Sequence, residues 1–311
     1  AEEFQARRDV IYQAIGENIA LIQGGEYVQG FIVFRQSNTF YYLSGLETEG
    51  SYMVLDGRRK KTTIYLPRRD VERERGEGQK LSADDGDLVK KITGADEVRT
   101  VEYMAEDFTN RFLRGPEIPA LYTPHSPAEG ELQSRDEILY GQGRQAADPW
   151  DGRPSKVGHF IGLLNKRYPQ FEIRDLSPTL DHMRIIKDKK EVGLIRKASQ
   201  LAGMGIMEAI RSTKPGVKEY QLEAAAKFVF YNNGARGVSY NAIVGGGKNA
   251  WMGHYSANSD AVKNGDLILM DIAPDYHYYT SDVTRMWPVG GAYSEDQRVL
   301  YGFIIEYHKA F

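Results

Sequence analysis

Two aspartates, Asp271 and Asp282, give the strongest indication of chemistry in this sequence of 311 residues. Asp271 follows the apolar run 267–270, which is typical of a strand buried on both faces, and Asp282 lies in a second strand-like segment. A carboxylate in such surroundings is costly unless a positive charge compensates it. The segment 274–277 is a plausible reversal, so two adjacent antiparallel strands would bring the carboxylates side by side.

Like charges held this close need a shared proton or a shared cation. Hard divalent ions prefer oxygen ligands, and hydrolytic sites with two metal ions use bridging carboxylates. The spacing alone leaves a structural alternative open, in which Asp282 pairs with Arg285 and Asp271 caps a turn.

The apolar pattern before these strands predicts alternating helices and strands, which is typical of an α/β domain. We predict helices over residues 4–22, 85–92 and 156–167, and strands over 30–34, 52–56, 62–66, 98–101 and 137–140. Asp56 and Gly57 form a hairpin signal between two of these strands.

The character of the sequence changes near residue 180. We predict helices over 189–211 and 219–232, then strands over 237–244, 266–272 and 278–287, and a final helix over 293–311. The predicted domains are therefore residues 1–175 and 176–311.

Composition restricts the class of protein. Hydrophobic residues make up 41% and charged residues 27%, as in soluble globular proteins, and the net charge of -3 favours neither a nucleic acid nor a membrane as partner. The sequence has no cysteine, which excludes disulfides, thiolate ligands and a cysteine nucleophile. No apolar stretch approaches the roughly 20 residues that span a bilayer, and we expect a cytoplasmic protein.

The segments that precede the two aspartates in the sequence belong to the same motif. The segment 239–249, then Gly253, His254 and Tyr255, then the two aspartate segments closely resemble the aminopeptidase P branch of the creatinase and methionine aminopeptidase superfamily, peptidase family M24B. Residues 34–45 resemble this branch's Arg-Gln-x-x-x-Phe-x-Tyr-x-x-Gly stretch, and residues 176–211 are similar to its linker and first catalytic helix.

The resemblance implies an α/β N-terminal creatinase-like domain, followed by an α+β pita-bread catalytic domain that is incomplete in this chain. It implies a metal-dependent Xaa-Pro aminopeptidase, an exopeptidase that releases the residue before a proline by means of a hydroxide bridging two divalent ions. The ions would be manganese, with cobalt or zinc as alternatives. A peptide with proline at its second position is the implied substrate, and we expect a homo-oligomer.

The resemblance also implies roles for individual residues. Asp271 and Asp282 would bind metal, with Asp282 as the bridging ligand. His254 would be catalytic, contacting the substrate and stabilising the tetrahedral intermediate without binding metal. Tyr240 would line the pocket for the N-terminal residue.

Some features depart from the family pattern. One histidine and two glutamates of the family's metal site are expected beyond Phe311, so the chain is expected to be a fragment or to be completed by another chain. Ile272 and Pro274 replace parts of the usual Asp-Ala-Gly segment, which leaves substrate preference open. The alternatives are an Xaa-Pro dipeptidase (prolidase), a non-catalytic pita-bread binding protein, and metal-free creatinase-like chemistry.

Overall fold

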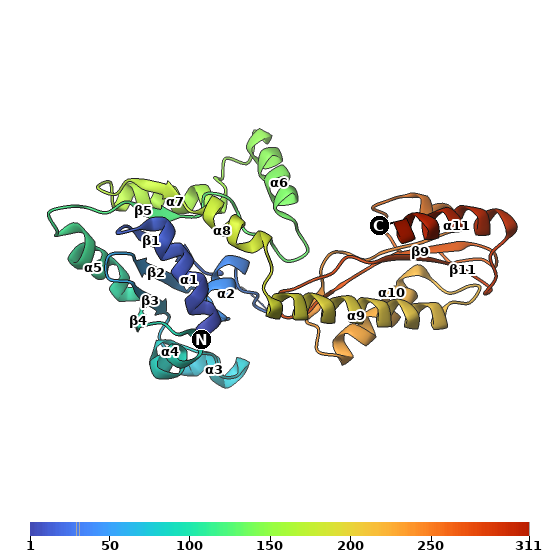
Figure 1. Ribbon diagram of the computed structural model, residues 1–311, viewed down its shortest axis with the longest axis horizontal. Coiled ribbons are helices and arrows are strands. Elements are labelled where there is room, and N and C mark those ends of the chain that lie inside the picture. Colours follow the sequence, from blue (N-terminus) through green and yellow to red (C-terminus); the bar gives the residue numbers. More distant parts are fainter. Residues whose placement is uncertain (29, 31, 311) are drawn as a thin grey trace. The chain divides into compact units, whose positions relative to one another are not determined.

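The computed structural model describes residues 1–28, 30 and 32–310, which form two compact units, Ala1–Ile186 and Lys187–Phe311 (Figure 1). The predicted domain boundary at residues 175/176 precedes this division. The difference arises because Leu176 and Leu180, at the start of helix α8 (Ser177–Ile185), are buried in the hydrophobic core of the first unit.

The first unit is built on a six-stranded sheet with the strand order β4-β3-β2-β1-β5-β6. Its strands are β1 (Ile19–Gln23), β2 (Tyr52–Asp56), β3 (Lys61–Leu66), β4 (Glu97–Thr100), β5 (Leu121–Thr123) and β6 (Ile173–Asp175). Strands β2 and β3 form the predicted hairpin and pair in antiparallel register, whereas β3–β4, β1–β5 and β5–β6 pair in parallel. The unit is therefore a mixed α/β domain, as the sequence predicted.

Helices cover both faces of this sheet (Figure 1). One face packs against α1 (Glu2–Ile15), α2 (Asn38–Ser44), α4 (Gly86–Thr93) and α8. The other packs against α5 (Met104–Phe108), the π-helical turn η3 (Thr109–Leu113) and α7 (Lys156–Arg167). The remaining helical segments of the unit are α3 (Val71–Glu77), α6 (Arg135–Ala147) and the 3-10 turns η1 (Ala83–Asp85) and η2 (Val101–Tyr103).

Strand β1 corrects the prediction of a single helix over residues 4–22. Helix α1 ends at Ile15, and residues 19–23 form the strand that lies between β2 and β5. Ala20 and Ile22 pack into one core, whereas Ile19 and Leu21 pack into the core on the opposite face. Because both faces are buried, this strand shows no alternation of polar and apolar residues, and its apolar run is compatible with a continuation of the helix.

Two further strands predicted in the first unit, over residues 137–140 and 30–34, are not found among the described residues. Residues 137–140 belong to helix α6, which begins with a capping box in which Ser134 and Glu137 exchange side-chain to backbone hydrogen bonds. In the predicted strand 30–34, Phe31 lies outside the described residues, and the described remainder forms no strand. Ile32 is 66% exposed and Val33 83% exposed, so these two apolar side chains lie outside the core.

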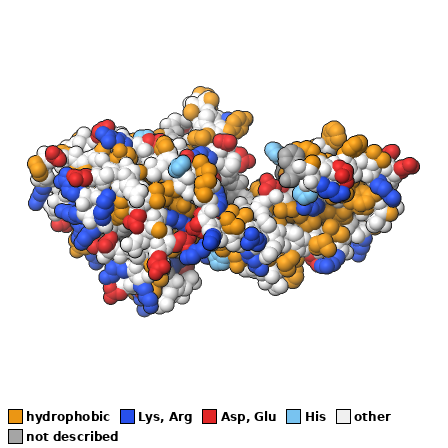
Figure 2. Space-filling model, viewed as in Figure 1, with side chains coloured by type: hydrophobic (Ala, Val, Ile, Leu, Met, Phe, Trp, Pro, Cys, Tyr) orange, Lys and Arg blue, Asp and Glu red, His pale blue; other side chains and the backbone are white. Residues whose placement is uncertain are grey.

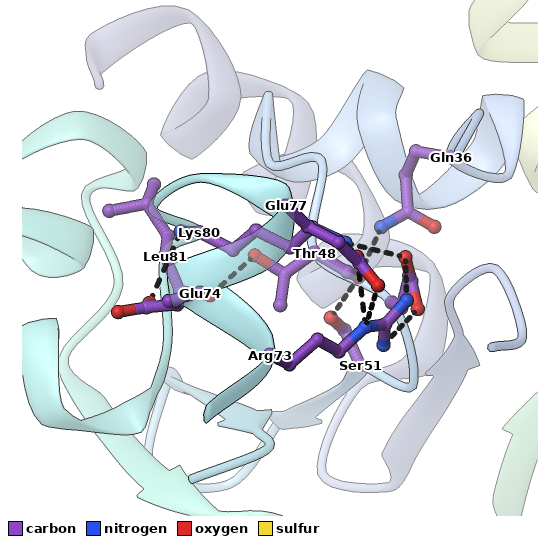
Figure 3. A network of polar contacts seen from close by, with 9 residues as sticks. Gln36, Thr48, Ser51, Arg73, Glu74, Glu77, Lys80 and Leu81 are labelled. Atoms are coloured by element: carbon purple, nitrogen blue, oxygen red, sulfur yellow. Dashed lines mark hydrogen bonds and ion pairs between the residues drawn. The ribbon is translucent and has the colours of Figure 1, made fainter. Parts of the chain in front are cut away.

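A buried carboxylate, Glu49, is compensated by two basic side chains from the α3 region. Arg73 donates to it at 3.0 Å and Lys80 at 3.2 Å, and Figure 3 shows both basic residues. Beside them the buried amide of Gln36 donates to the carbonyl oxygen of Thr48 at 3.0 Å. Gln36, which belongs to the segment 34–45 noted in the sequence, thus holds the loop that leads into β2.

The second unit contains two packed helices, α9 (Lys189–Ser212) and α10 (Glu219–Asn232), against a three-stranded sheet of order β11-β9-β8. These strands are β8 (Ile243–Gly246), β9 (Leu267–Asp271) and β11 (Thr284–Pro288). A two-stranded pair joins β7 (Gly237–Val238) to β10 (Pro274–Asp275). A Cβ atom at Gly205 of α9 would lie 2.6 Å from the Phe230 ring of α10, so glycine permits the close helix contact.

The predicted strands of this unit are shortened. The prediction over 237–244 becomes β7 and β8 with Tyr240 between them, and the prediction over 278–287 becomes β11, which starts only at Thr284. The final helix, α11 (Glu295–Ala310), follows the prediction over 293–311, of which Phe311 lies outside the described residues. Apolar side chains are exposed along α11, and Figure 2 shows such side chains on the surface of this unit.

No helix within residues 1–28, 30 and 32–310 is long and apolar enough to cross a membrane.

Arg8 of α1 is buried, and its guanidinium reaches the C-terminal ends of two other helices. It donates to Leu43 O of α2 at 2.8 Å, and to Thr93 O and Gly94 O at the end of α4 at 2.9 Å each. Burial lowers the pKa of this guanidinium from its ordinary value. Helix ends leave carbonyl groups unsatisfied and favour a positive charge, so Arg8 joins three helices through one side chain.

We expect Arg8→Met to lower the free energy of unfolding by about 3–5 kcal/mol, because three carbonyl oxygens would lose their donor inside the core. Urea denaturation of the protein measures this change. The matched control is Arg58→Met, because Arg58 is exposed and pairs with the exposed carboxylates of Glu17 and Glu117. That variant should change stability by less than about 1 kcal/mol. Equal losses in both variants would contradict this account of Arg8.

Candidate functional site

Asp271 is the last residue of β9, the central strand of the three-stranded sheet. It is paired with Thr284 of β11 on one side and with Ile243 of β8 on the other. Ile268 and Met270 of the same strand are fully buried in the hydrophobic core of the unit. The core therefore fixes the strand, and the strand fixes where its terminal carboxylate lies.

The chain reverses after β9 in a tight turn centred on His277 and Tyr278. These residues have φ angles of 51° and 69°, and Tyr276 and Tyr279 exchange backbone hydrogen bonds of 2.9 and 3.1 Å. Two consecutive positive φ angles are typical of a type I′ hairpin turn. The reversal predicted at residues 274–277 is therefore real but lies further along the chain, since Pro274 and the residue after it first pair with β7.

The returning chain runs antiparallel to β9 before it enters β11. Ile272 N donates to Val283 O at 3.3 Å, and Thr284 is the residue opposite Asp271. Asp282 lies two positions before Thr284, outside the strand itself, and its side chain is exposed. Side chains two positions apart along an extended chain share a face, so Asp282 is expected diagonally opposite Asp271.

The hydroxyl group of Tyr240 joins the two aspartates. It donates a hydrogen bond to Oδ1 of Asp271, and it lies 3.2 Å from Oδ1 of Asp282. The two carboxylates are therefore neither distant from each other nor on opposite sides of the sheet. Burial raises the pKa of Tyr240, and the hydrogen bond to Asp271 raises it further, so the phenol stays protonated as a donor.

The donor set suits a hard divalent cation in its chemistry, because Asp271 and Asp282 present carboxylate oxygens on one face. It is a partial set. Among residues 1–28, 30 and 32–310, no group of three or more His, Cys, Asp or Glu side chains is placed to hold a metal ion. Metal binding by Asp271 and Asp282 therefore stays a prediction from the sequence.

His254 lies on an exposed turn after the 3-10 helix η4 (Gly247–Trp251), in the loop that connects β8 to β9. A Cβ atom at Gly245 would lie 2.7 Å from Asn249 O, so glycine lets the strand lie against the start of this loop. The structure thus brings Tyr240, Asp271 and Asp282 together, and it places His254 on the exposed loop between β8 and β9.

Sequence reasoning missed the burial of two glutamates, one of which holds this loop. Glu219, at the start of α10, is fully buried and accepts hydrogen bonds from the loop. Glu191, at the start of α9, is also buried and accepts from the hydroxyl of Tyr279 at 2.8 Å. Both are acidic residues in the first turn of a helix, where an exposed glutamate is equally favourable, so the sequence pattern gives no signal of burial.

Two family descriptions match the chain. Residues 4–122 match the aminopeptidase P N-terminal domain, and residues 193–311 match metallopeptidase family M24.

Individual relatives extend over nearly the whole chain. An Xaa-Pro aminopeptidase of Haemophilus influenzae is 29% identical over 99% of this chain and 65% of its own length. A human Xaa-Pro dipeptidase is 25% identical over 94% of this chain and 55% of its own length. The chain thus spans less than two thirds of these relatives.

A solved structure shares the fold. Aminopeptidase P of Escherichia coli, with the inhibitor Pro-Leu, superimposes with a TM-score of 0.76 at 25% identity, over 98% of this chain and 66% of that chain. The fold class predicted from the sequence, an α/β N-terminal domain followed by an α+β pita-bread domain, is thereby confirmed.

We expect His277→Asn to raise the free energy of unfolding by about 0.5 kcal/mol, because asparagine adopts positive φ more readily at this turn position. Thermal or urea denaturation measures the change. The control is His125→Asn, since His125 is exposed and lies outside the left-handed region. A gain of the same size in the control would show that the turn conformation is not its source.

Proposed function

We propose that the chain is part of a metal-dependent exopeptidase, because residues 193–311 match metallopeptidase family M24 and residues 4–122 match the N-terminal domain of aminopeptidase P. The proposed reaction is hydrolysis of the peptide bond before a proline at the second position, which releases the N-terminal residue. The observation that carries the proposal is the convergence of Asp271 and Asp282 on the hydroxyl of Tyr240.

Asp271 and Asp282 would hold the metal, with Asp282 as the bridging ligand. Asp271 is positioned by a buried strand, and the exposed Asp282 faces the solvent from which substrate and ions arrive. Divalent ions bound there would lower the pKa of a water molecule and polarise the scissile carbonyl group. The proposal extends to two such ions, with manganese preferred over cobalt or zinc.

Tyr240 and His254 would act on the substrate. Tyr240, half-buried beside both carboxylates, would line the pocket for the N-terminal residue and keep the two carboxylates in one orientation. His254 would donate a hydrogen bond to the oxygen that gains charge as the carbonyl is attacked. Its exposed position on the loop leaves the imidazole accessible to a peptide.

A second candidate is an Xaa-Pro dipeptidase, because the human relative carries that name. The two activities differ in whether the substrate extends beyond the proline. Hydrolysis of an Xaa-Pro-Xaa tripeptide supports the aminopeptidase, whereas hydrolysis of Xaa-Pro alone supports the dipeptidase. A homo-oligomer in the cytoplasm remains our proposal for its assembly and location.

We expect Asp282→Ala to abolish hydrolysis of an Xaa-Pro-Xaa peptide in the intact protein supplied with Mn²⁺, while the exposed position leaves the fold intact. A peptide hydrolysis assay measures the loss of activity, and circular dichroism measures whether the fold is intact. The control is Asp296→Ala, which removes an exposed carboxylate from the first turn of α11. Full activity in the Asp282 variant would end the metal proposal.

We expect His254→Ala to lower kcat by about 10²-fold to 10³-fold with a small change in KM, because the lost hydrogen bond acts mainly in the transition state. Steady-state kinetics on the same peptide separate the two constants. The control is His308→Ala, which changes another exposed histidine, in the last turn of α11. A rise in KM with unchanged kcat would assign His254 to ground-state binding instead.

A further inference from the structure

Glu219, the first residue of α10, has no solvent-exposed surface. Its carboxylate accepts four hydrogen bonds. Oε1 accepts from Gly246 N at 2.7 Å and from the Asn249 side chain at 3.0 Å. Oε2 accepts from the Tyr255 hydroxyl and from Asp260 N, both at 2.9 Å. Two donors on each oxygen fill the acceptor capacity of an ionised carboxylate.

All four donors belong to the segment 246–260, which leaves β8 and carries His254. Gly246 stands at its start and Asp260 at its end, so one side chain ties both ends together. The backbone of the helix adds to this attachment, because Tyr220 N donates to Asn258 O at 2.8 Å. The loop is therefore fastened to the positive N-terminal end of α10, where a negative side chain is favourable.

Asn249 makes hydrogen bonds within the loop, and Asn258 bonds the loop to the sheet. The side-chain amide of Asn249, which is buried, lies 3.1 Å from the Tyr255 hydroxyl and 3.1 Å from Asp260 Oδ2. The amide of Asn258 accepts from Val244 N at 3.1 Å and donates to the carbonyl of the residue before β8 at 2.8 Å. Asn249 thus belongs to the polar network around Glu219, and Asn258 holds the end of the loop against β8.

The stability of the buried Glu219 carboxylate depends on the position of the segment 246–260. A buried carboxylate without hydrogen bonds is costly, and the four bonds above come from amide and hydroxyl groups rather than from a cation. Such donors stabilise the charge only in a fixed geometry. Any displacement of the segment 246–260 would remove donors from the buried charge, so the charge opposes that displacement.

We propose that Glu219 is a positioning residue for the peptidase reaction, which holds the loop so that His254 stands in place for the substrate. This inference rests on the proposed function. Tyr255 is the direct link, because it follows His254 in the chain and its hydroxyl bonds to the Glu219 carboxylate. Glu219 touches no reacting atom and acts through the loop.

Two variants test the proposal in the intact protein. Glu219→Gln keeps the size of the side chain but replaces one acceptor oxygen by an NH₂ group, which opposes a backbone N–H at one end of the loop. Tyr255→Phe removes only the hydroxyl, so it remains informative if the first variant fails to fold. Tyr220→Phe is the matched control, because Tyr220 is an exposed tyrosine on the same helix.

Three readouts separate positioning of His254 from a general effect on stability. Both variants should speed hydrogen exchange of the amides in 246–260, by about tenfold in Glu219→Gln. Both should shift the His254 imidazole resonance, assigned with a His254→Gln variant. Both should lower kcat for an Xaa-Pro-Xaa peptide with Mn²⁺, by about tenfold in Glu219→Gln, with little change in KM. Tyr220→Phe should match the unchanged protein throughout.

The proposal is overturned if both variants keep the original kcat and His254 resonance, or if Tyr220→Phe changes them equally. If the unchanged protein hydrolyses no such peptide, the proposed function fails. The imidazole resonance and the exchange rates then still decide whether Glu219 positions the loop. Failure of the proposed peptidase function is therefore distinguishable from failure of the positioning role of Glu219.

Discussion

Two carboxylates that lie near each other on one face of a sheet repel, and the second unit of this protein is arranged around that fact. Ile268 and Met270 anchor the strand of Asp271 in the core. Asp282 is brought to it by a turn with two consecutive positive φ angles. The Tyr240 hydroxyl contacts both carboxylates but brings no positive charge. A bound cation would neutralise the pair, and we regard this requirement as the origin of the proposed chemistry.

The supporting structure fixes positions by burying charged side chains among hydrogen-bond partners. In the second unit, Glu219 holds the loop of His254 through neutral donors, and Glu191 accepts from Tyr279 beyond the turn. In the first unit, Glu49 is compensated by basic side chains, and the Arg8 guanidinium joins the ends of two helices. Buried charges of this kind tolerate little movement, because a lost partner leaves the charge unsatisfied. Functional loops gain from such rigidity.

The sequence predicted the features that depend on local pattern. The strand ending at Asp271 was found from its continuous apolar run, and the β2–β3 hairpin from Asp56 and Gly57. The similar apolar run of β1 was not recognised, because it follows helix α1 closely and residues 4–22 were predicted as one helix. Glu219 could not be found, because its burial depends on a loop that begins 27 positions later in the chain. Contacts at that separation follow from tertiary packing, which residue spacing alone does not determine.

The central claim is that Asp271 and Asp282 bind the same metal site, and diffraction from crystals of the protein soaked in Mn²⁺ tests it most directly. Anomalous scattering locates manganese without reference to activity or to any assumed mechanism. The account predicts an anomalous peak within about 2.0–2.6 Å of carboxylate oxygens from both aspartates, the range of metal–oxygen bonds for such ions. Manganese bound elsewhere, or no peak at these two side chains, would contradict it.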